Sequence, residues 1–154
     1  MLESMLASVV LAISVFAVTL PFTASVRNDE AQQRRTVAAA LAQEMMEEIL
    51  AKPFSDPQGE SACGPEADES SRALFDNIDD YHSLNEQANS IAGFSGLAMT
   101  EAAAAGLSRH VTAQYVYVSG QQTDEAPTFL RVTVEVRYEK TPLVTLTRLI
   151  YSQE

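Results

Sequence analysis

Hydrophobic positions follow three patterns along the chain, and the first is an uninterrupted apolar run. No charge occurs from Ser4 to Val26, which reads SMLASVVLAISVFAVTLPFTASV. At about 1.5 Å per residue, a helix of this length crosses a hydrocarbon core of about 30 Å, so the run predicts a membrane-spanning helix. A cleaved secretory signal is the weaker alternative, because such signals begin with basic residues and none precedes this run.

The second pattern is helical and follows the polar stretch RNDEAQQRR. Apolar residues recur every four positions, and the acids of the segment take the other side: Val37, Leu41, Met45 and Ile49 against Glu44, Glu47 and Glu48. Lys52 and Pro53 provide a stop, because the residue before proline avoids helical geometry. We expect one helix from near residue 2 to residue 51, with an apolar face that needs a partner.

The third pattern is alternation, which is clearest in TFLRVTVEVRYEK. Alternate positions are apolar, and this predicts a strand with one buried face: Leu130, Val132, Val134, Val136 and Tyr138. The neighbouring segments SRHVTAQYVYVS and LVTLTRLIYS are rich in β-formers, and Thr141-Pro142 is expected to turn the chain between the last two strands. Three strands in an antiparallel meander are therefore predicted.

These patterns combine into an α+β fold. A sheet with one apolar face needs a cover, and we expect the helix to provide it through Leu41, Met45 and Ile49. The predicted organisation is a long N-terminal helix over residues 1–53, of which 4–26 span the membrane, and a globular head over 54–154. Within the head, residues 54–106 are rich in Ser, Gly, Pro and Asp and predict a variable loop, with a short helix around Met99 to Ala105. The strands occupy 107–152.

Composition limits the function. The net charge is −11 and no basic cluster exceeds the pair Arg34 and Arg35, so binding of nucleic acid is not expected. The single cysteine, Cys63, cannot form an intramolecular disulfide. His82 and His110 are the only histidines, and no Gly-rich phosphate loop or nucleophile elbow occurs, so no enzyme activity, catalytic residue or cofactor is predicted.

One acidic segment, FDNIDDYH, raises the question of a metal site. Asp76, Asp79, Asp80 and His82 lie close together there, and hard oxygen ligands at this spacing are able to hold calcium. The segment lacks the glycine and the closing glutamate of an EF-hand loop. A solvated acidic turn is the favoured interpretation, and no metal site is predicted.

The first residues of the chain resemble the start of the mature helix in type IV pilins and type II secretion pseudopilins, where an apolar residue or two precede a glutamate and an apolar run: MLESMLASVVLAISV. The segments LAQEMMEEILAKPF and FDNIDDYH and the terminal strands are similar to the minor pilin and minor pseudopilin branch. The resemblance covers about the first 54 residues well and the head only in plan. It implies a pilin-like fold and a structural subunit that assembles through its N-terminal helix into a pilus or pseudopilus.

The resemblance also gives Glu3 a role in subunit assembly. In the family the glutamate pairs with the amino terminus of a neighbouring subunit's helix and sets the subunit register. The alternative is an acid at the water interface, favoured by the helix dipole by well under about 1 kcal/mol. Pro21 removes one backbone donor and predicts a helix kink, either a tolerated proline near the interface or a weak point that lets the helix stretch during assembly.

Partners implied by the resemblance are other pilins or pseudopilins of the filament and an inner-membrane assembly platform. Family members carry a short basic leader ending in glycine, which does not precede Met1 here, so we expect a start upstream and prepilin peptidase as a further partner. Without such a leader, Arg27, Arg34 and Arg35 would favour the opposite membrane orientation. The expected location is the inner membrane, with the head on the periplasmic or extracellular side. The alternative function is a single-pass membrane-anchored binding module that does not polymerise.

Overall fold

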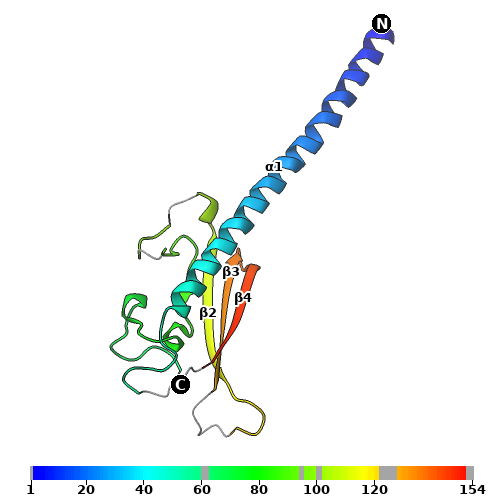
Figure 1. Cartoon of the computed structure of the whole chain (residues 1–154). Coiled ribbons are helices and arrows are strands. Elements are labelled where there is room, and N and C mark those ends of the chain that lie inside the picture. The colour runs from blue at the N-terminus through cyan, green and yellow to red at the C-terminus, as the bar shows by residue number, and fades with distance from the viewer. Residues whose placement is uncertain (1, 60–62, 94–95, 100–101, 122–127, 152–154) are drawn as a thin grey trace. The chain divides into compact units, whose positions relative to one another are not determined.

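One long helix and one antiparallel sheet make up most of the chain, which is therefore an α+β protein. The structure is a computed structural model that describes residues 2–59, 63–93, 96–99, 102–121 and 128–151. Helix α1, Leu2–Leu50, contains 49 residues and ends just before Lys52 and Pro53, where the sequence predicts its stop (Figure 1). The chain divides into two compact units, and the boundary between them lies within α1, after Arg34, rather than after residue 53.

The sheet has four strands, one more than the alternation predicts. They pair antiparallel in chain order: β1 Asn85–Glu86, β2 Leu107–Val116, β3 Phe129–Tyr138 and β4 Thr141–Tyr151. The additional strand, β1, is only two residues long and pairs with His110 and Arg109 of β2. A strand this short has no hydrophobic period, so the sequence gives no signal for it.

The turn between β3 and β4 differs from the sequence-based expectation. Glu139 and Lys140 form it, with positive φ angles of 47° and 73°, whereas Thr141 and Pro142 already belong to β4. The predicted turn at Thr141-Pro142 is therefore wrong by two residues. Pro142 is tolerated inside a strand because β4 is at the edge of the sheet. A bulge follows, since Val136 pairs with Val144 while Arg137 pairs with Pro142, which leaves Leu143 unpaired between them.

The core lies between one face of the sheet and the C-terminal part of α1, which runs along that face (Figure 1). The alternating apolar residues of β3 are fully buried there: Leu130, Val132, Val134 and Val136. Leu41, Met45 and Ile49 of α1 belong to the same core, and none of them is more than 1% exposed. This packing makes the second half of the helix part of the head.

Where the structure describes it, the segment between α1 and β2 contains three short 3₁₀ helices: η1 Arg72–Leu74, η2 Asp79–Tyr81 and η3 Ala102–Ala104. The last replaces the α-helix expected around Met99 to Ala105, of which residues 100 and 101 lie outside the described residues. Three alanines form only one turn, which Gly106 ends with a φ of +76°. Apolar residues of this segment complete the core: Phe75, Ile78, Tyr81 and Ile91.

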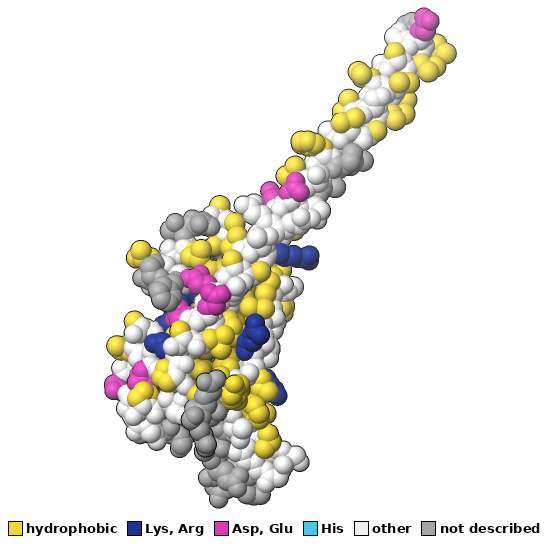
Figure 2. Space-filling model, in the orientation of Figure 1, with side chains coloured by type: hydrophobic (Ala, Val, Ile, Leu, Met, Phe, Trp, Pro, Cys, Tyr) yellow, Lys and Arg dark blue, Asp and Glu magenta, His cyan; other side chains and the backbone are white. Residues whose placement is uncertain are grey.

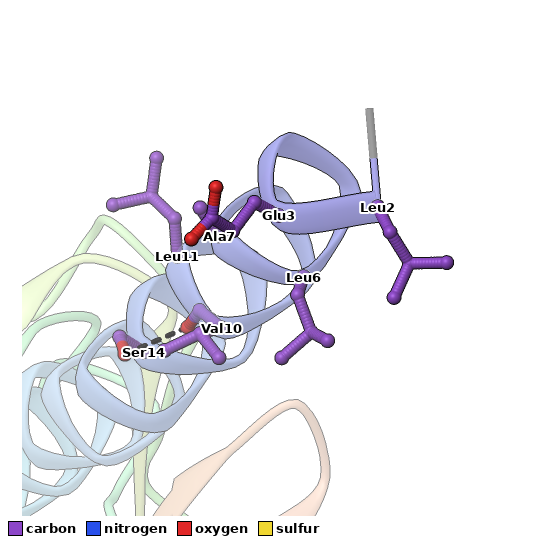
Figure 3. Close-up of a pocket in the computed structure, with 7 residues that line it drawn as sticks. All are labelled: Leu2, Glu3, Leu6, Ala7, Val10, Leu11 and Ser14. Atoms are coloured by element: carbon purple, nitrogen blue, oxygen red, sulfur yellow. Dashed lines mark hydrogen bonds between the residues drawn. The ribbon is translucent and has the colours of Figure 1, made fainter.

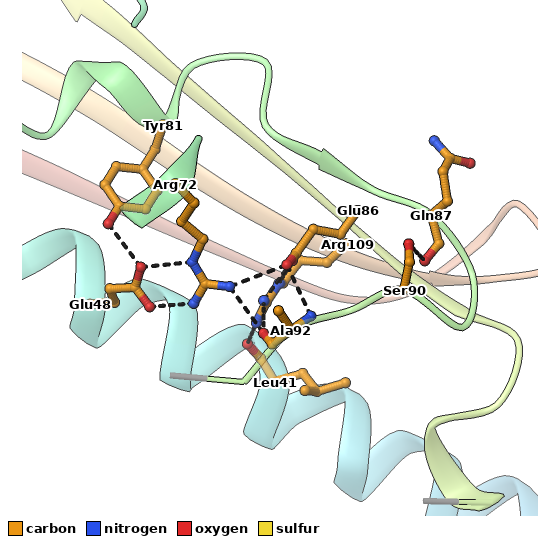
Figure 4. Close-up of polar contacts among 9 residues, drawn as sticks. All are labelled: Leu41, Glu48, Arg72, Tyr81, Glu86, Gln87, Ser90, Ala92 and Arg109. Atoms are coloured by element: carbon orange, nitrogen blue, oxygen red, sulfur yellow. Dashed lines mark hydrogen bonds and ion pairs between the residues drawn. The ribbon is translucent and has the colours of Figure 1, made fainter. Parts of the chain in front are cut away.

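A buried arginine connects the sheet to the helix. Arg109 of β2 points to the core side, where it is 1% exposed. Its guanidinium donates hydrogen bonds to the backbone oxygens of Leu41 in α1, at 3.0 Å, and of Ala92, at 2.8 Å (Figure 4). It also forms an ion pair with Glu86 of β1, at 2.5 Å. One side chain therefore holds three separate segments together.

A second arginine extends this network to the loop. Arg72 of η1 pairs with Glu48 of α1 and also with Glu86, whose Oε1 lies 3.2 Å from its Nη1 (Figure 4). The Tyr81 hydroxyl donates to Glu48 Oε1 at 2.9 Å. Burial raises the pKa of Glu48, but hydrogen bonds from Arg72 and Tyr81 and the nearby positive charges outweigh this effect and hold the pKa below its usual 4.5. We call Glu48, Arg72, Tyr81, Glu86 and Arg109 the ion-pair network.

Substituting Arg109→Gln tests this network. We expect the free energy of unfolding of the head to fall by about 3 kcal/mol or more, because Glu86 and two carbonyls lose a buried charged donor. Arg131→Gln, on the exposed side of β3, is the matched control and should change the free energy by less than about 0.5 kcal/mol. Urea denaturation followed by near-UV circular dichroism measures both. Equal stability of the two variants would contradict a stabilising role for the contacts of Arg109.

The lowered pKa of Glu48 predicts acid sensitivity. The contacts of Glu48 stabilise the head while Glu48 is ionised, so this contribution is complete above pH 4.5 and is lost as pH falls through the lower pKa of the folded state. We expect Glu48→Gln to lower stability at neutral pH and to reduce its dependence on pH below 4.5. Glu47→Gln, which changes the exposed neighbour, should retain the acid dependence of the parent. Urea midpoints measured as a function of pH give both profiles.

Candidate membrane and assembly segment

The N-terminal part of α1 exposes nearly all of its apolar side chains. Its large hydrophobic residues are between 45% and 78% exposed, from Val26 to Leu2 (Figure 2). Isolated apolar residues on a protein surface need no explanation, whereas a continuous apolar surface marks a region that contacts lipid or another protein. This part of the helix therefore requires a non-aqueous environment.

The hydroxyl groups in this segment satisfy their hydrogen-bonding needs within the helix. Ser8 donates to the carbonyl of Ser4 at 2.7 Å, and Ser14 donates to that of Val10 at 2.8 Å. Thr19 bonds in the same way to the carbonyl of the residue four positions earlier, at 2.5 Å. In a lipid environment polar groups must find their partners inside the protein. These serines and threonine are thus compatible with a bilayer.

The length of the segment also fits a membrane. Residues Leu2–Thr19 form an 18-residue window that is apolar enough to cross a membrane, and none of it is buried. The core helix of a soluble protein would be mostly buried, so this absence of internal packing distinguishes the segment from such a helix. At about 1.5 Å per residue the window is about 27 Å long, close to the thickness of a hydrocarbon core.

Glu3 is the only charged residue before Arg27. It lies in the first turn of α1, on a surface depression lined by apolar and small side chains: Leu2, Leu6, Ala7, Val10, Leu11 and Ser14 (Figure 3). No ion pair of the described residues includes Glu3. Its carboxylate therefore needs water or a positive group from another molecule when the surrounding surface is covered.

The structure places the other predicted site residues in two separate parts of the helix. The backbone of α1 is helical through Pro21, but its side chain lies outside the described residues, and the kink remains a prediction. Leu41, Met45 and Ile49 lie in the core of the head. Glu3 and Pro21 belong to one compact unit, and the three core residues belong to the other.

The acidic segment FDNIDDYH is not a solvated turn, so that interpretation is wrong. Asn77, Asp79 and Asp80 are at most 1% exposed. The reason lies in the residues between them, because Phe75, Ile78 and Tyr81 belong to the core and draw the segment inward. Two features of the sequence could have signalled this burial. One is the mixture of acidic and apolar residues in the segment, and the other is Arg109 at a core-facing position of β2.

Cys63 has the properties of an inert thiol. Its sulfur donates a hydrogen bond to the carbonyl of Ala113 at 3.3 Å. Burial, together with the negative charges of Asp79 and Asp80, raises the pKa of this thiol to about 11. The thiolate is the nucleophilic form, so the raised pKa gives no sign of an activated cysteine.

Comparisons with protein-family models, curated proteins and solved structures gave no match to this chain. The resemblance to pilins and pseudopilins therefore stays a prediction from the sequence.

The apolar segment leads to a prediction about membrane insertion. Ile13→Arg should oppose insertion by about 3 kcal/mol, because arginine at the centre of a spanning helix is costly. We expect most of this variant to be extracted from membranes by alkaline carbonate, while the parent and the matched control Ile13→Leu stay in the pellet. Extraction of the parent and of Ile13→Leu together with Ile13→Arg would show that this segment does not span the bilayer.

Proposed function

We propose that this chain is a structural subunit, a minor pilin or pseudopilin, that assembles into a filament by packing its N-terminal helix against the helices of other subunits. The observation that carries the proposal is the fully exposed apolar window Leu2–Thr19 with one acid, Glu3, at its tip. Other subunits of the filament, an inner-membrane assembly platform and prepilin peptidase are the proposed partners.

The energetics of leaving the membrane support helix bundling. Burying a large apolar side chain is worth about 1.5 to 3 kcal/mol, so an isolated helix with this many of them cannot move from lipid into water. A bundle of like helices provides equivalent burial. Assembly then exchanges contacts with lipid for contacts with sister helices, and no chemical reaction is required.

Glu3 is a residue that a membrane anchor without an assembly role would not need. An acid inside an apolar bundle is strongly unfavourable unless a positive group pairs with it. We propose that the amino terminus of a neighbouring subunit supplies that charge and that the pair fixes the register between subunits. A single-pass anchor with a binding head would instead leave Glu3 at the water interface, where its removal has little effect.

The head is proposed to lie on the periplasmic or extracellular side of the inner membrane. Its own core is complete without the apolar window, because the second half of α1 covers the sheet. The helix tip is therefore available for assembly while the head stays folded. Peptide mass spectrometry of the mature N-terminus, which would be cleaved and methylated in a pilin, provides a separate check.

Glu3→Ala tests the assembly role in cells that contain the other subunits. We expect the amount in membranes to be unchanged, whereas recovery in the sheared filament fraction falls at least about tenfold, which corresponds to about 1.4 kcal/mol. Glu30→Ala, an exposed acid of the same compact unit outside the apolar window, is the matched control and should assemble normally. Immunoblotting of the two fractions gives the ratio.

Two outcomes would contradict the proposal. If Glu3→Ala entered filaments as well as the parent, the carboxylate would have only an interfacial role. If cross-linking found the parent protein only as a single copy in the membrane, with all partner subunits present, the chain would be an anchored module instead.

A further inference from the structure

A groove runs between the C-terminal end of α1 and the second half of β4. Two hollows of about 500 and 350 Å³ form it, and Leu50 and Arg148 line both of them. The larger hollow has mostly apolar walls, to which α1, the loop and β4 contribute: Phe54, Ile78, Leu149 and Tyr151. Binding sites commonly have volumes of about 300 to 1,000 Å³. We call this feature the α1–β4 groove.

The walls of the α1–β4 groove expose apolar surface that the core of the head does not use. Leu50 is 45% exposed, Leu149 is 56% exposed and Tyr151 is 57% exposed. The other exposed large hydrophobic residues described in the head line neither hollow: Leu74, Leu97 and Val118. Single exposed apolar residues are normal, whereas several gathered in one groove indicate a surface that another molecule covers.

Arg148 occupies a position of β4 where the alternation calls for an apolar side chain. It pairs in register with Val132, which is fully buried, and its neighbours on the same face, Leu146 and Ile150, pack against the core. Arg148 itself is exposed, and no ion pair of the described residues includes it. The groove therefore presents a cation between apolar side chains.

The α1–β4 groove is positive on a chain that is otherwise acidic, with a net charge of −11. Lys52 adds a second cation, because its ammonium group donates to the carbonyl of Phe75, a neutral acceptor. Glu47 is the one acid among the described lining residues, and its carboxylate accepts a hydrogen bond from Gln43 at 2.9 Å. The groove thus attracts a carboxylate that the rest of the surface repels.

The edge of β4 also limits how a partner can bind. Prolines, bulges and charges that point to the core side block the addition of a strand to an open edge, and β4 contains Pro142 and Arg148. The groove remains open to side chains. It therefore suits a helix or a loop that inserts apolar side chains between α1 and β4, as the anchor residues of protein interfaces do. An anionic bilayer surface suits it less, because the acidic remainder of the chain would face the same headgroups.

We propose that the α1–β4 groove is a docking site for a second protein that presents an aspartate or glutamate flanked by apolar side chains. Arg148 pairs with that carboxylate, while Leu50, Leu149 and Tyr151 are covered by the apolar side chains. An ion pair enclosed in this way is screened less by water than a pair on open surface, so its charge contributes both affinity and specificity. The inference does not rest on assembly into a filament, since an anchored module would use the same groove.

Site-specific photo-cross-linking in the native cells identifies the partner. Leu149 of the full-length protein is replaced by p-benzoylphenylalanine, and we expect one discrete adduct with another protein. Mass spectrometry of the adduct should place the linked segment beside an Asp or Glu that apolar residues flank. The same photoreactive residue in place of Thr145, an exposed position of β4 outside both hollows, is the matched control and should not give this adduct.

Charge reversal tests the role of Arg148. Arg148→Glu retains a charge on the core side of β4, so the edge stays blocked, but it reverses the charge that meets the partner. We expect the yield of the adduct to fall at least about tenfold. Lys140→Glu makes the same change in net charge at the exposed turn between β3 and β4 and should leave the yield unchanged. Both variants should keep the urea midpoint of the parent, because both side chains are exposed.

A synthetic peptide with the cross-linked segment then measures affinity directly. Fluorescence anisotropy follows its binding to the full-length protein in lipid nanodiscs. Replacing the acid of the peptide by lysine should weaken binding to the parent at least about tenfold and should restore binding to Arg148→Glu. Such a reciprocal exchange identifies the ion pair rather than a general effect of charge.

Three results would overturn the proposal. The first is no protein adduct from position 149. The second is an adduct that Arg148→Glu leaves unchanged, since Arg148 would then only block the edge of the sheet. The third is an adduct with lipid or with a second copy of this chain. Glu3→Ala reports on entry into filaments and position 149 reports on the groove, so each proposal can fail while the other stands.

Discussion

The head depends on the contact between the Arg109 guanidinium and the backbone carbonyl of Leu41, in the C-terminal part of α1. A fully buried arginine is stable only when each of its donors has an acceptor, and here the acceptors come from the helix, from β1 and from the loop. Because Leu41 and Arg109 are 68 positions apart, this contact joins the helix to a strand distant in the sequence. Movement of the helix by one turn would take the Leu41 carbonyl away from the guanidinium.

The charges of the network balance, since it contains two arginines and two glutamates, whereas Glu66, Glu69 and Asp80 bring acids alone close together. The segment between α1 and β2 therefore contributes both to a neutral, satisfied group and to a group with excess negative charge. The apolar window of α1 takes no part in either group, so the stability of the head and that of this window depend on different physical effects.

The large elements were predictable because each has a long and regular pattern. The run before Arg27, the stop at Lys52 and Pro53 and the alternation of β3 locate α1 and the central strand closely. The ion-pair network was not predictable, because Glu48 and Arg72 are 24 positions apart and neither lies in a motif. Burial of Asp80 had only a weak local signal, the apolar residues Ile78 and Tyr81 on either side of the acids, because the packing that draws the segment inward is tertiary.

The proline and the bulge near the start of β4 have a consequence for the open side of the sheet. A long edge strand is a template on which other chains can add strands, and natural proteins block such growth with prolines and bulges. Pro142 and Leu143 place both devices side by side on β4. They protect the head against aggregation by sheet extension. The exposed apolar surface of the head-distal half of α1 is not protected in this way.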